Sequence, residues 1–167
     1  MTKLIICSDS HGAVGNLEKI FKEEKGMDAV IYLGDGLRDY DRASPFARRA
    51  RLYGVAGNCD NNVLEPSEGL IAFDGVLFFY THGHHYGVKY GMDTITQAAL
   101  DRGADVALFG HTHHPLCEER AGVLLFNPGS CGRAYSGPDT YGIIMVDHGK
   151  IVSAEHKFVP GETEAAN

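Results

Sequence analysis

The chain has 167 residues, of which 44% are hydrophobic and 22% charged, the balance of an ordinary globular protein. Its net charge of −7 at pH 7 argues against a nucleic-acid-binding surface, because phosphate backbones are held by clustered Lys and Arg. No apolar run approaches the roughly 20 residues that cross a bilayer, so no membrane contact is expected. The N-terminus lacks a signal-peptide pattern, and the four cysteines are scattered, which favours free thiols in a cytoplasmic protein.

The first half of the chain alternates strand and helix patterns, which predicts a parallel α/β core. Strands are expected over residues 3–7, 29–33 and 52–56, where short apolar runs end in polar residues or glycine. Helices are expected over residues 13–24 and roughly 39–50. The first of these helices is marked by apolar residues that recur at helical spacing.

The second half carries three hairpin signals, the strongest at Asp74-Gly75. The hairpin strands are expected over 69–73 and 76–81, 116–120 and 123–126, and 141–146 and 151–158. A helix over about 93–102 and a buried strand over 106–109 separate the first two hairpins. We expect one domain over residues 1–160 and a polar, disordered tail over 161–167. The elements together predict an α/β sandwich with helices outside.

Five of the expected strands end in a loop that carries good metal ligands. These ligands are Asp9, His11, Asp35, Asn58, His82, His111 and His113. In open α/β sheets, ligands bind outside the carboxyl ends of the strands, so these side chains are expected to converge in one crevice. Seven candidates exceed the three or four protein ligands of a zinc ion and fit two metals that share one carboxylate.

The ordered motifs resemble the signature of the calcineurin-like metallophosphoesterases. They are Asp9-x-His11, Gly34-Asp35, Gly57-Asn58-x-Asp60, His82 and Gly110-His111-x-His113. Within that family the chain is similar to the compact phosphodiesterase group that includes the YfcE-type enzymes and the retromer subunit Vps29. The resemblance implies a four-layer α/β/β/α sandwich of two mixed β-sheets flanked by helices. By analogy with small members of the family, it also implies a homo-oligomer.

The resemblance further implies two metal sites that share Asp35. Asp9, His11, Asp35 and His113 would hold the first metal, and Asp35, Asn58, His82 and His111 the second. Asp35 and Asn58 would therefore belong to the catalytic machinery. Mixed imidazole and oxygen ligands favour Mn²⁺, with iron, nickel or zinc as alternatives. Two such cations would activate water for in-line attack on the phosphorus of a small phosphoester.

One position departs from the family pattern. Many members carry a histidine directly after the Asn, where it assists the leaving group, and here that position is Cys59, a poor proton donor. His84 is an alternative acid or phosphate contact, or else a solvated loop residue, and Arg133 is a further candidate contact for a phosphate oxygen. Because no insertion large enough for a cap domain separates the motifs, we expect an open and shallow site.

The leading hypothesis is a phosphodiesterase that uses metal-activated water. The alternatives are a phosphomonoesterase or nucleotidase, a metal-binding scaffold for protein interactions like Vps29, and a purely structural metal site. The complete ligand set favours an enzyme, although ligands alone do not establish turnover.

Overall fold

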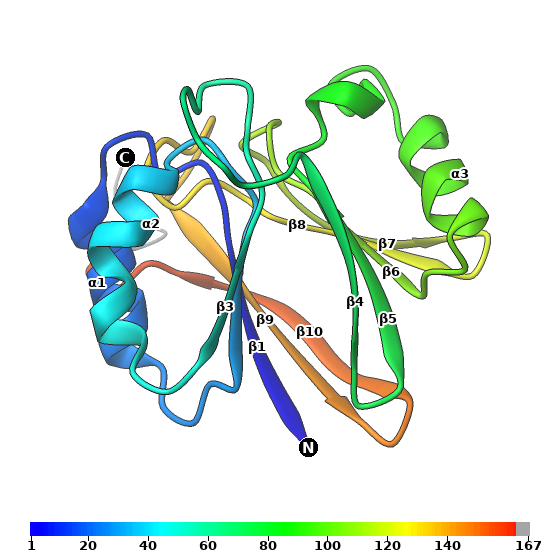
Figure 1. Cartoon of the computed structure of the whole chain (residues 1–167), viewed down its shortest axis with the longest axis horizontal. Coiled ribbons are helices and arrows are strands. Elements are labelled where there is room, and N and C mark those ends of the chain that lie inside the picture. The colour runs from blue at the N-terminus through cyan, green and yellow to red at the C-terminus, as the bar shows by residue number, and fades with distance from the viewer. Residues whose placement is uncertain (163–167) are drawn as a thin grey trace.

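The computed structural model describes residues 1–162, which form two β-sheets packed face to face with helices on their outer sides (Figure 1). The first sheet contains β1 (Thr2–Cys7), β2 (Ala29–Tyr32), β3 (Arg51–Gly54), β9 (Thr140–Asp147) and β10 (Lys150–Phe158), in the order β10-β9-β1-β2-β3. Strands β1, β2 and β3 are parallel, and β9 runs antiparallel to both β1 and β10. The expected parallel core is therefore confirmed.

The second sheet is built from the central part of the chain. It contains β4 (Glu68–Phe73), β5 (Val76–Thr81), β6 (Val106–Leu108), β7 (Pro115–Arg120) and β8 (Val123–Pro128), in the order β4-β5-β6-β8-β7. The neighbours β5, β6 and β8 are parallel, while β4 and β7 close hairpins at the two edges. All three expected hairpins are present.

Within residues 1–162, three α-helices cover the sheets. They are α1 (Val14–Glu23), α2 (Leu37–Ala43) and α3 (Asp93–Asp101), and two short 3₁₀ segments accompany them, η1 (Ser44–Ala47) and η2 (His84–Tyr86). The helix predicted over 39–50 was wrong in extent, because α2 ends at Ala43 and the chain continues as η1. Pro45 explains the break, since proline lacks the N–H that would continue the helix by donating to the carbonyl of Asp41, which accepts a hydrogen bond from Ser44 Oγ instead.

The apolar residues form three layers. Ile6, Ile31, Phe78 and Leu108 belong to a cluster contributed by both sheets. A second cluster joins α1 and α2 to the first sheet, and a third joins α3 to the second sheet. Figure 1 shows α1 and α2 on one side of the molecule and α3 on the other, so the four-layer α/β/β/α sandwich is confirmed.

Two expectations concern the ends of elements and of the chain. The strand predicted over 52–56 begins one residue earlier and ends at Gly54. The predicted tail over 161–167 lies outside the described residues, apart from residues 161 and 162. Within the described residues, no helix is long and apolar enough to cross a membrane.

Candidate metal centre

The loops that follow β1, β2, β5 and β6 meet at one end of the two sheets. Backbone hydrogen bonds tie them together in pairs: the N–H of Asp9 donates to the carbonyl of Gly34 at 2.9 Å, and the N–H of Gly110 donates to the carbonyl of His82 at 2.9 Å. Because parallel strands present their carboxyl ends at the same edge, residues about 100 positions apart in sequence become neighbours here. The expected convergence of strand-end residues is therefore what the structure shows.

Asp9 lies at the middle of this region and is fully buried. Its Oδ2 accepts hydrogen bonds from the backbone N–H of His111 at 3.0 Å and from Ser8 Oγ at 2.5 Å. Its Oδ1 has no hydrogen-bond partner within residues 1–162. Three imidazoles surround that oxygen, with the Nε2 atoms of His113, His11 and His82 at 3.2, 3.6 and 3.8 Å. A buried anionic oxygen among imidazole nitrogens is suited to a bound cation.

Asp35 is the second carboxylate of the region. Its Oδ2 lies 3.2 Å from His82 Nε2 and 3.8 Å from His11 Nε2, so it faces a histidine from each of the two implied ligand sets. Its Oδ1 accepts a hydrogen bond from the backbone N–H of Cys59 at 2.7 Å. This position between two groups of histidines suits a carboxylate that would be shared by two cations.

The ligand atoms fall into three overlapping groups, each within 4.8 Å. The groups are Asp9, His11 and His113; Asp35, His82 and His111; and His11, Asp35 and Cys59. The first group lies within the first ligand set that the family resemblance implies, and the second group lies within the second set. Carboxylate and imidazole donors at this spacing fit divalent transition metals.

The histidine rings are oriented by hydrogen bonds on the side away from the carboxylates. His82 Nδ1 donates to the carbonyl of Leu33 at 2.7 Å, and His113 Nδ1 donates to the carbonyl of Arg133 at 2.7 Å. With Nδ1 engaged, the Nε2 atom of each ring faces the carboxylates. A second hydrogen bond of this kind is typical of histidines that ligate metals.

The charges of the site reinforce one another. Burial disfavours the ionised form of Asp9, but the imidazoles of His11 and His113, with Nε2 3.6 and 3.2 Å from Oδ1, outweigh it and hold the pKa of that carboxyl well below its usual value. Burial likewise opposes ionisation of Asp35, yet contact with His82 lowers its pKa. The adjacent Asp9 carboxylate raises the pKa of His113. The site thus holds two ionised carboxylates in a buried environment.

His111 differs from the other histidines of the site. Burial, together with the positive charges of His82 and Lys89, lowers its pKa to about 4. Its imidazole is therefore neutral at neutral pH and keeps a lone pair free to bind a metal. Its Nδ1 lies 3.2 Å from His82 Nε2, so the two rings face each other.

The backbone around the site is unusually strained. Of the ten non-glycine residues with positive φ in the described part of the chain, five are predicted ligands: Asp9, His11, Asp35, His111 and His113. Such conformations are uncommon for residues with a side chain and persist only where the surroundings enforce them. Their concentration at one place is typical of a functional site.

Two glycines without positive φ let the loops approach closely. A Cβ on Gly57 would overlap the carboxylate of Asp35, and a Cβ on Gly110 would overlap Ser8 Oγ and Asp9 Oδ2. Only glycine leaves room for the carboxylates at these two points. The glycine of each motif is therefore explained by the geometry of the site.

The remaining predicted residues lie at the edge of this cluster. Asn58 is exposed, and its amide nitrogen lies 3.5 Å from Cys59 Sγ. The His84 ring lies 5.3 Å from His82 and 6.1 Å from His111, and its Nδ1 is buried with no hydrogen-bond partner in residues 1–162. Arg133 contributes its carbonyl to His113, and its side chain is exposed.

Several supporting residues could not be identified from the sequence. Asp60 appeared in a motif without a role, yet its carboxylate accepts hydrogen bonds from the backbone N–H groups of Asp35, Gly36, Leu37 and Gly57. Tyr32, a tyrosine inside an apolar strand, donates to the carbonyl of Asp35 at 3.2 Å. Asn127 donates to the carbonyl of Gly110 at 3.1 Å. Of these three residues, Asp60 had a signal in the sequence, its place in the Gly57-Asn58-x-Asp60 motif.

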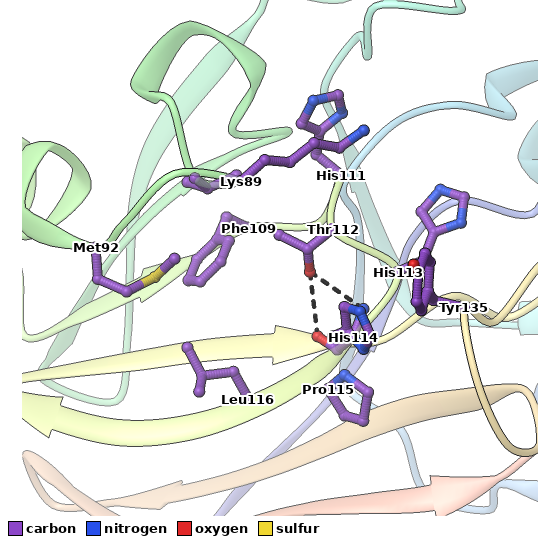
Figure 2. Close-up of a pocket in the computed structure, with 11 residues that line it drawn as sticks. Lys89, Met92, Phe109, His111, Thr112, His113, His114, Pro115, Leu116 and Tyr135 are labelled. Atoms are coloured by element: carbon purple, nitrogen blue, oxygen red, sulfur yellow. Dashed lines mark hydrogen bonds between the residues drawn. The ribbon is translucent and has the colours of Figure 1, made fainter.

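The expectation of an open and shallow site was incomplete. A hollow of about 540 Å³ adjoins the predicted ligands His111 and His113. Figure 2 shows both histidines on the same side of this hollow, with apolar side chains opposite them. The sequence did not reveal it, because its walls come from segments that are far apart in the chain.

Comparison with known proteins places these observations in a family. Residues 2–149 match the calcineurin-like phosphoesterase superfamily domain. The chain is 30% identical to the phosphodiesterase YfcE of Escherichia coli over 171 residues, which covers 88% of this chain and 89% of that protein. It is also 30% identical to the phosphodiesterase MJ0936 of Methanocaldococcus jannaschii over 160 residues, covering 85% of this chain and 92% of that protein.

Solved structures show the same fold. A predicted phosphoesterase from Streptococcus pneumoniae superposes with a TM-score of 0.81 at 24% identity, covering 99% of this chain and 94% of that one. A Vps29 variant from Entamoeba histolytica superposes with a TM-score of 0.76 at 18% identity, covering 94% of this chain and 99% of that one. At these identities the structural likeness establishes the fold alone.

Proposed function

The chain belongs to the calcineurin-like phosphoesterase superfamily, and from that premise we propose that it is a metal-dependent phosphodiesterase. The observation that carries the proposal is Asp9 Oδ1, which is buried, without a hydrogen-bond partner in residues 1–162, and surrounded by three imidazoles. The sequence relatives YfcE and MJ0936, which align over most of their length, are both named phosphodiesterases.

The proposed centre holds two divalent cations, with Mn²⁺ the favoured metal. Asp9, His11, Asp35 and His113 form one ligand set, and Asp35, Asn58, His82 and His111 form the other. The two compact groups of histidines and carboxylates support this division, as does the position of Asp35 between His11 and His82. When bound, such cations polarise the phosphoryl group and acidify a water molecule.

The residues of the chain itself have two tasks in the proposed reaction. Asp9 and Asp35 supply negative charge that offsets the cations, and buried hydrogen bonds hold these carboxylates in place. The carbonyls of Leu33 and Arg133 fix the rings of His82 and His113, so that the ligand nitrogens need no reorganisation. The net effect is a rigid, pre-organised surface for the phosphoryl group.

Two residues are candidates to assist the departing alcohol. Cys59 sits beside Asp35, where burial and the charge of that carboxylate raise the pKa of its thiol and keep it protonated at neutral pH. His84 lies beside His82 and His111 with a free ring nitrogen. Neither has the arrangement of a strong general acid, so we expect diesters with good leaving groups to react fastest.

The finer expectations about the protein's surroundings extend this proposal. We propose a small phosphoester as substrate and a cytoplasmic location, which the four free cysteines support. Residues 1–160 are proposed to act as one domain, because both sheets contribute to one shared apolar cluster. A homo-oligomeric state remains a prediction from the family resemblance.

Hydrolysis of model substrates tests the proposed function. Metal-stripped protein is assayed with bis-p-nitrophenyl phosphate and p-nitrophenyl phosphate, with and without added Mn²⁺. Mn²⁺-dependent cleavage of the diester, with little cleavage of the monoester, is expected for the wild type. Asp35→Asn and His82→Ala are expected to abolish it, and full metal-dependent activity in both variants would contradict the proposal.

The same assay separates the alternatives. Faster turnover of the monoester would indicate a phosphomonoesterase or nucleotidase. Bound metal without cleavage of any phosphoester in a broad panel would favour a protein-interaction scaffold with the fold of Vps29.

A further inference from the structure

The metal centre lies between two hollows of different character. The first is the cavity of about 540 Å³ that includes His111 and His113 in its lining. The second, of about 260 Å³, includes His11 and Asp35. Since His11 and His113 approach within 3.2 Å of each other, the two hollows adjoin the same cluster of ligands from different sides. A phosphodiester has two esterifying groups, so two such hollows are what its binding requires.

The larger hollow, which we call the apolar hollow, has a rigid hydrophobic wall. Val88 and Phe109 are almost fully buried, and Met92 and Leu116 pack against the same cluster beneath α3. Figure 2 shows Met92, Phe109 and Leu116 along one side of the hollow. Its volume lies within the roughly 300–1,000 Å³ that is usual for small-molecule sites. This wall favours an apolar group with a defined shape.

The opposite wall is aromatic. The rings of His114 and Tyr135 pack together with their centroids 4.6 Å apart, and both line the hollow. The loop that carries Tyr135 is tied to the metal centre, because the backbone N–H of Tyr135 donates to the carbonyl of His113 at 3.4 Å. Tyr135 is 76% exposed, so a flat ring can stack against it, whereas an alkyl chain gains no such stacking contact.

A positive charge lies at the edge of the apolar hollow. Lys89 lines it, and Figure 2 shows its side chain extending alongside His111. In a chain with a net charge of −7, an ammonium group at this point favours an anionic substrate. It is therefore placed to contact the phosphate of a molecule whose ring occupies the hollow.

The smaller hollow is polar. Its lining includes Arg38, Asp39, Cys59 and Asp60, and it carries Cys59, a candidate to assist the leaving group. A departing alcohol gains charge or takes up a proton as it leaves, so a polar side open to water suits it better than an apolar wall. The two hollows therefore suit two different ends of the substrate.

We propose that the apolar hollow binds the esterifying group that stays on phosphorus, and that this group is a flat aromatic heterocycle such as a nucleobase. The leaving alcohol then departs over the smaller, polar hollow. Water supplies the new P–O bond, the P–O bond to the leaving alcohol breaks, and the alcohol takes up a proton. This inference rests on the proposed phosphodiesterase function and names its substrate class.

Two diesters with the same leaving group test the proposal. Thymidine 5′-(p-nitrophenyl phosphate) and methyl p-nitrophenyl phosphate both release p-nitrophenolate, and they differ only in the retained group. The Mn²⁺-loaded wild type is expected to show a kcat/KM at least about tenfold higher for the thymidine diester. Tyr135→Ala should reduce that preference about tenfold through KM, because base stacking on an aromatic ring is lost.

The matched control is Tyr90→Ala, since Tyr90 is 94% exposed and does not line the hollow. It should keep the preference of the wild type. Equal kcat/KM for both diesters in the wild type, or an unchanged preference in Tyr135→Ala, would overturn the subsite while leaving the phosphodiesterase function intact.

A binding measurement keeps the two proposals separable. Isothermal titration with thymidine 5′-phosphate needs no turnover, and ribose 5′-phosphate serves as the ligand without a base. If no diester is cleaved, the proposed function fails, and the subsite is then decided by binding alone. The subsite would be supported if thymidine 5′-phosphate binds more tightly than ribose 5′-phosphate and if Tyr135→Ala weakens the binding of the nucleotide. Equal binding of both ligands to the wild type would overturn the subsite.

Discussion

The two ends of helix α1 each carry a buried cluster of charge, and the two clusters are built differently. Past its C-terminal end, Glu24 is 6% exposed and accepts hydrogen bonds from Tyr141 Oη at 2.6 Å and Lys157 Nζ at 2.9 Å. Lys3 Nζ lies 2.9 Å from its other carboxylate oxygen. Both oxygens of Glu24 therefore have partners from the protein.

Before the N-terminal end of α1, the loop that follows β1 carries Asp9 and His11. Asp9 is buried more completely than Glu24, yet one of its oxygens has no hydrogen-bond partner in the described part of the chain. Two of the three imidazoles around it, those of His82 and His113, are held by backbone carbonyls on their far sides. At the C-terminal end of α1, the buried charge of Glu24 is neutralised by protein groups and stabilises the fold. At the N-terminal end, the buried charge of Asp9 leaves a place for a cation.

The largest expected effect comes from removing the charge of Asp9, near the N-terminal end of α1, which we call the unpartnered end. Asp9→Asn should lower Mn²⁺-dependent cleavage of bis-p-nitrophenyl phosphate by about 10³-fold, because a central anionic ligand is lost. The fold should survive, since the amide is cheaper to bury than the carboxylate. Steady-state kinetics measure the first effect and thermal unfolding the second, and activity within tenfold of the wild type would refute the role of Asp9.

At the C-terminal end of α1, which we call the paired end, a substitution is expected to lower stability and leave activity unchanged. Glu24→Gln should lower the free energy of unfolding by about 3 kcal/mol, because Lys3 and Lys157 lose the charge that neutralises them. Diester cleavage should be unchanged. Urea denaturation checks the stability, with Glu23→Gln as the control, since Glu23 is exposed beside it. A Glu24→Gln protein that is as stable as the wild type but impaired in catalysis would contradict a purely structural role for Glu24.

A residue behind the metal centre should have a smaller effect. Asp60→Ala removes the acceptor of four backbone N–H groups that shape the loops of Asp35 and Gly57. We expect Mn²⁺ affinity to fall about 10–100-fold, as is usual when the support of a ligand is removed. Asp41→Ala, an exposed change on α2, is the control, and equal affinities in both variants would show that Asp60 does not position Asp35.

The smallest effect is a dependence of stability on pH at the paired end. Burial alone would raise the pKa of Glu24, but the hydrogen bonds from Tyr141, Lys157 and Lys3 lower it from 4.5 to about 2. The ionised group therefore stabilises the fold above pH 4.5, and this stabilisation is lost as pH falls toward 2. The difference in unfolding free energy between wild type and Glu24→Gln should narrow as pH falls from 4.5 toward 2. A constant difference would show that the ionised carboxylate of Glu24 is not the source of the stabilisation.

Much of the fold and of the ligand cluster could be predicted from the sequence, because local patterns carry both. Apolar runs that end in Asp9, Asp35 or His82 mark strands and strand-end loops, and parallel strands bring those ends together. The break in helix 39–50 was missed, although Pro45 signals it. The chain position of each ligand was thus visible in the sequence.

What the sequence could not show depends on contacts across the fold. The hydrogen bonds that Asp60 accepts from Asp35, Gly36 and Leu37 join segments that are distant in the chain. The same is true of the hydrogen bond from the Ser10 N–H to Tyr32 Oη and of the partners of Glu24. The apolar hollow combines the segment between η2 and α3, the loop between β6 and β7 with the start of β7, and the loop that carries Tyr135. No spacing in the sequence specifies which of these segments face one another.

The most direct test of the contrast between the two ends of α1 is calorimetric titration of Mn²⁺ into metal-stripped protein. Two Mn²⁺ ions per chain are predicted for the wild type and for Glu24→Gln, with at least one lost in both Asp9→Asn and His82→Ala. Absence of binding to the wild type, or the same stoichiometry and affinity in all four proteins, would contradict a metal centre at the unpartnered end.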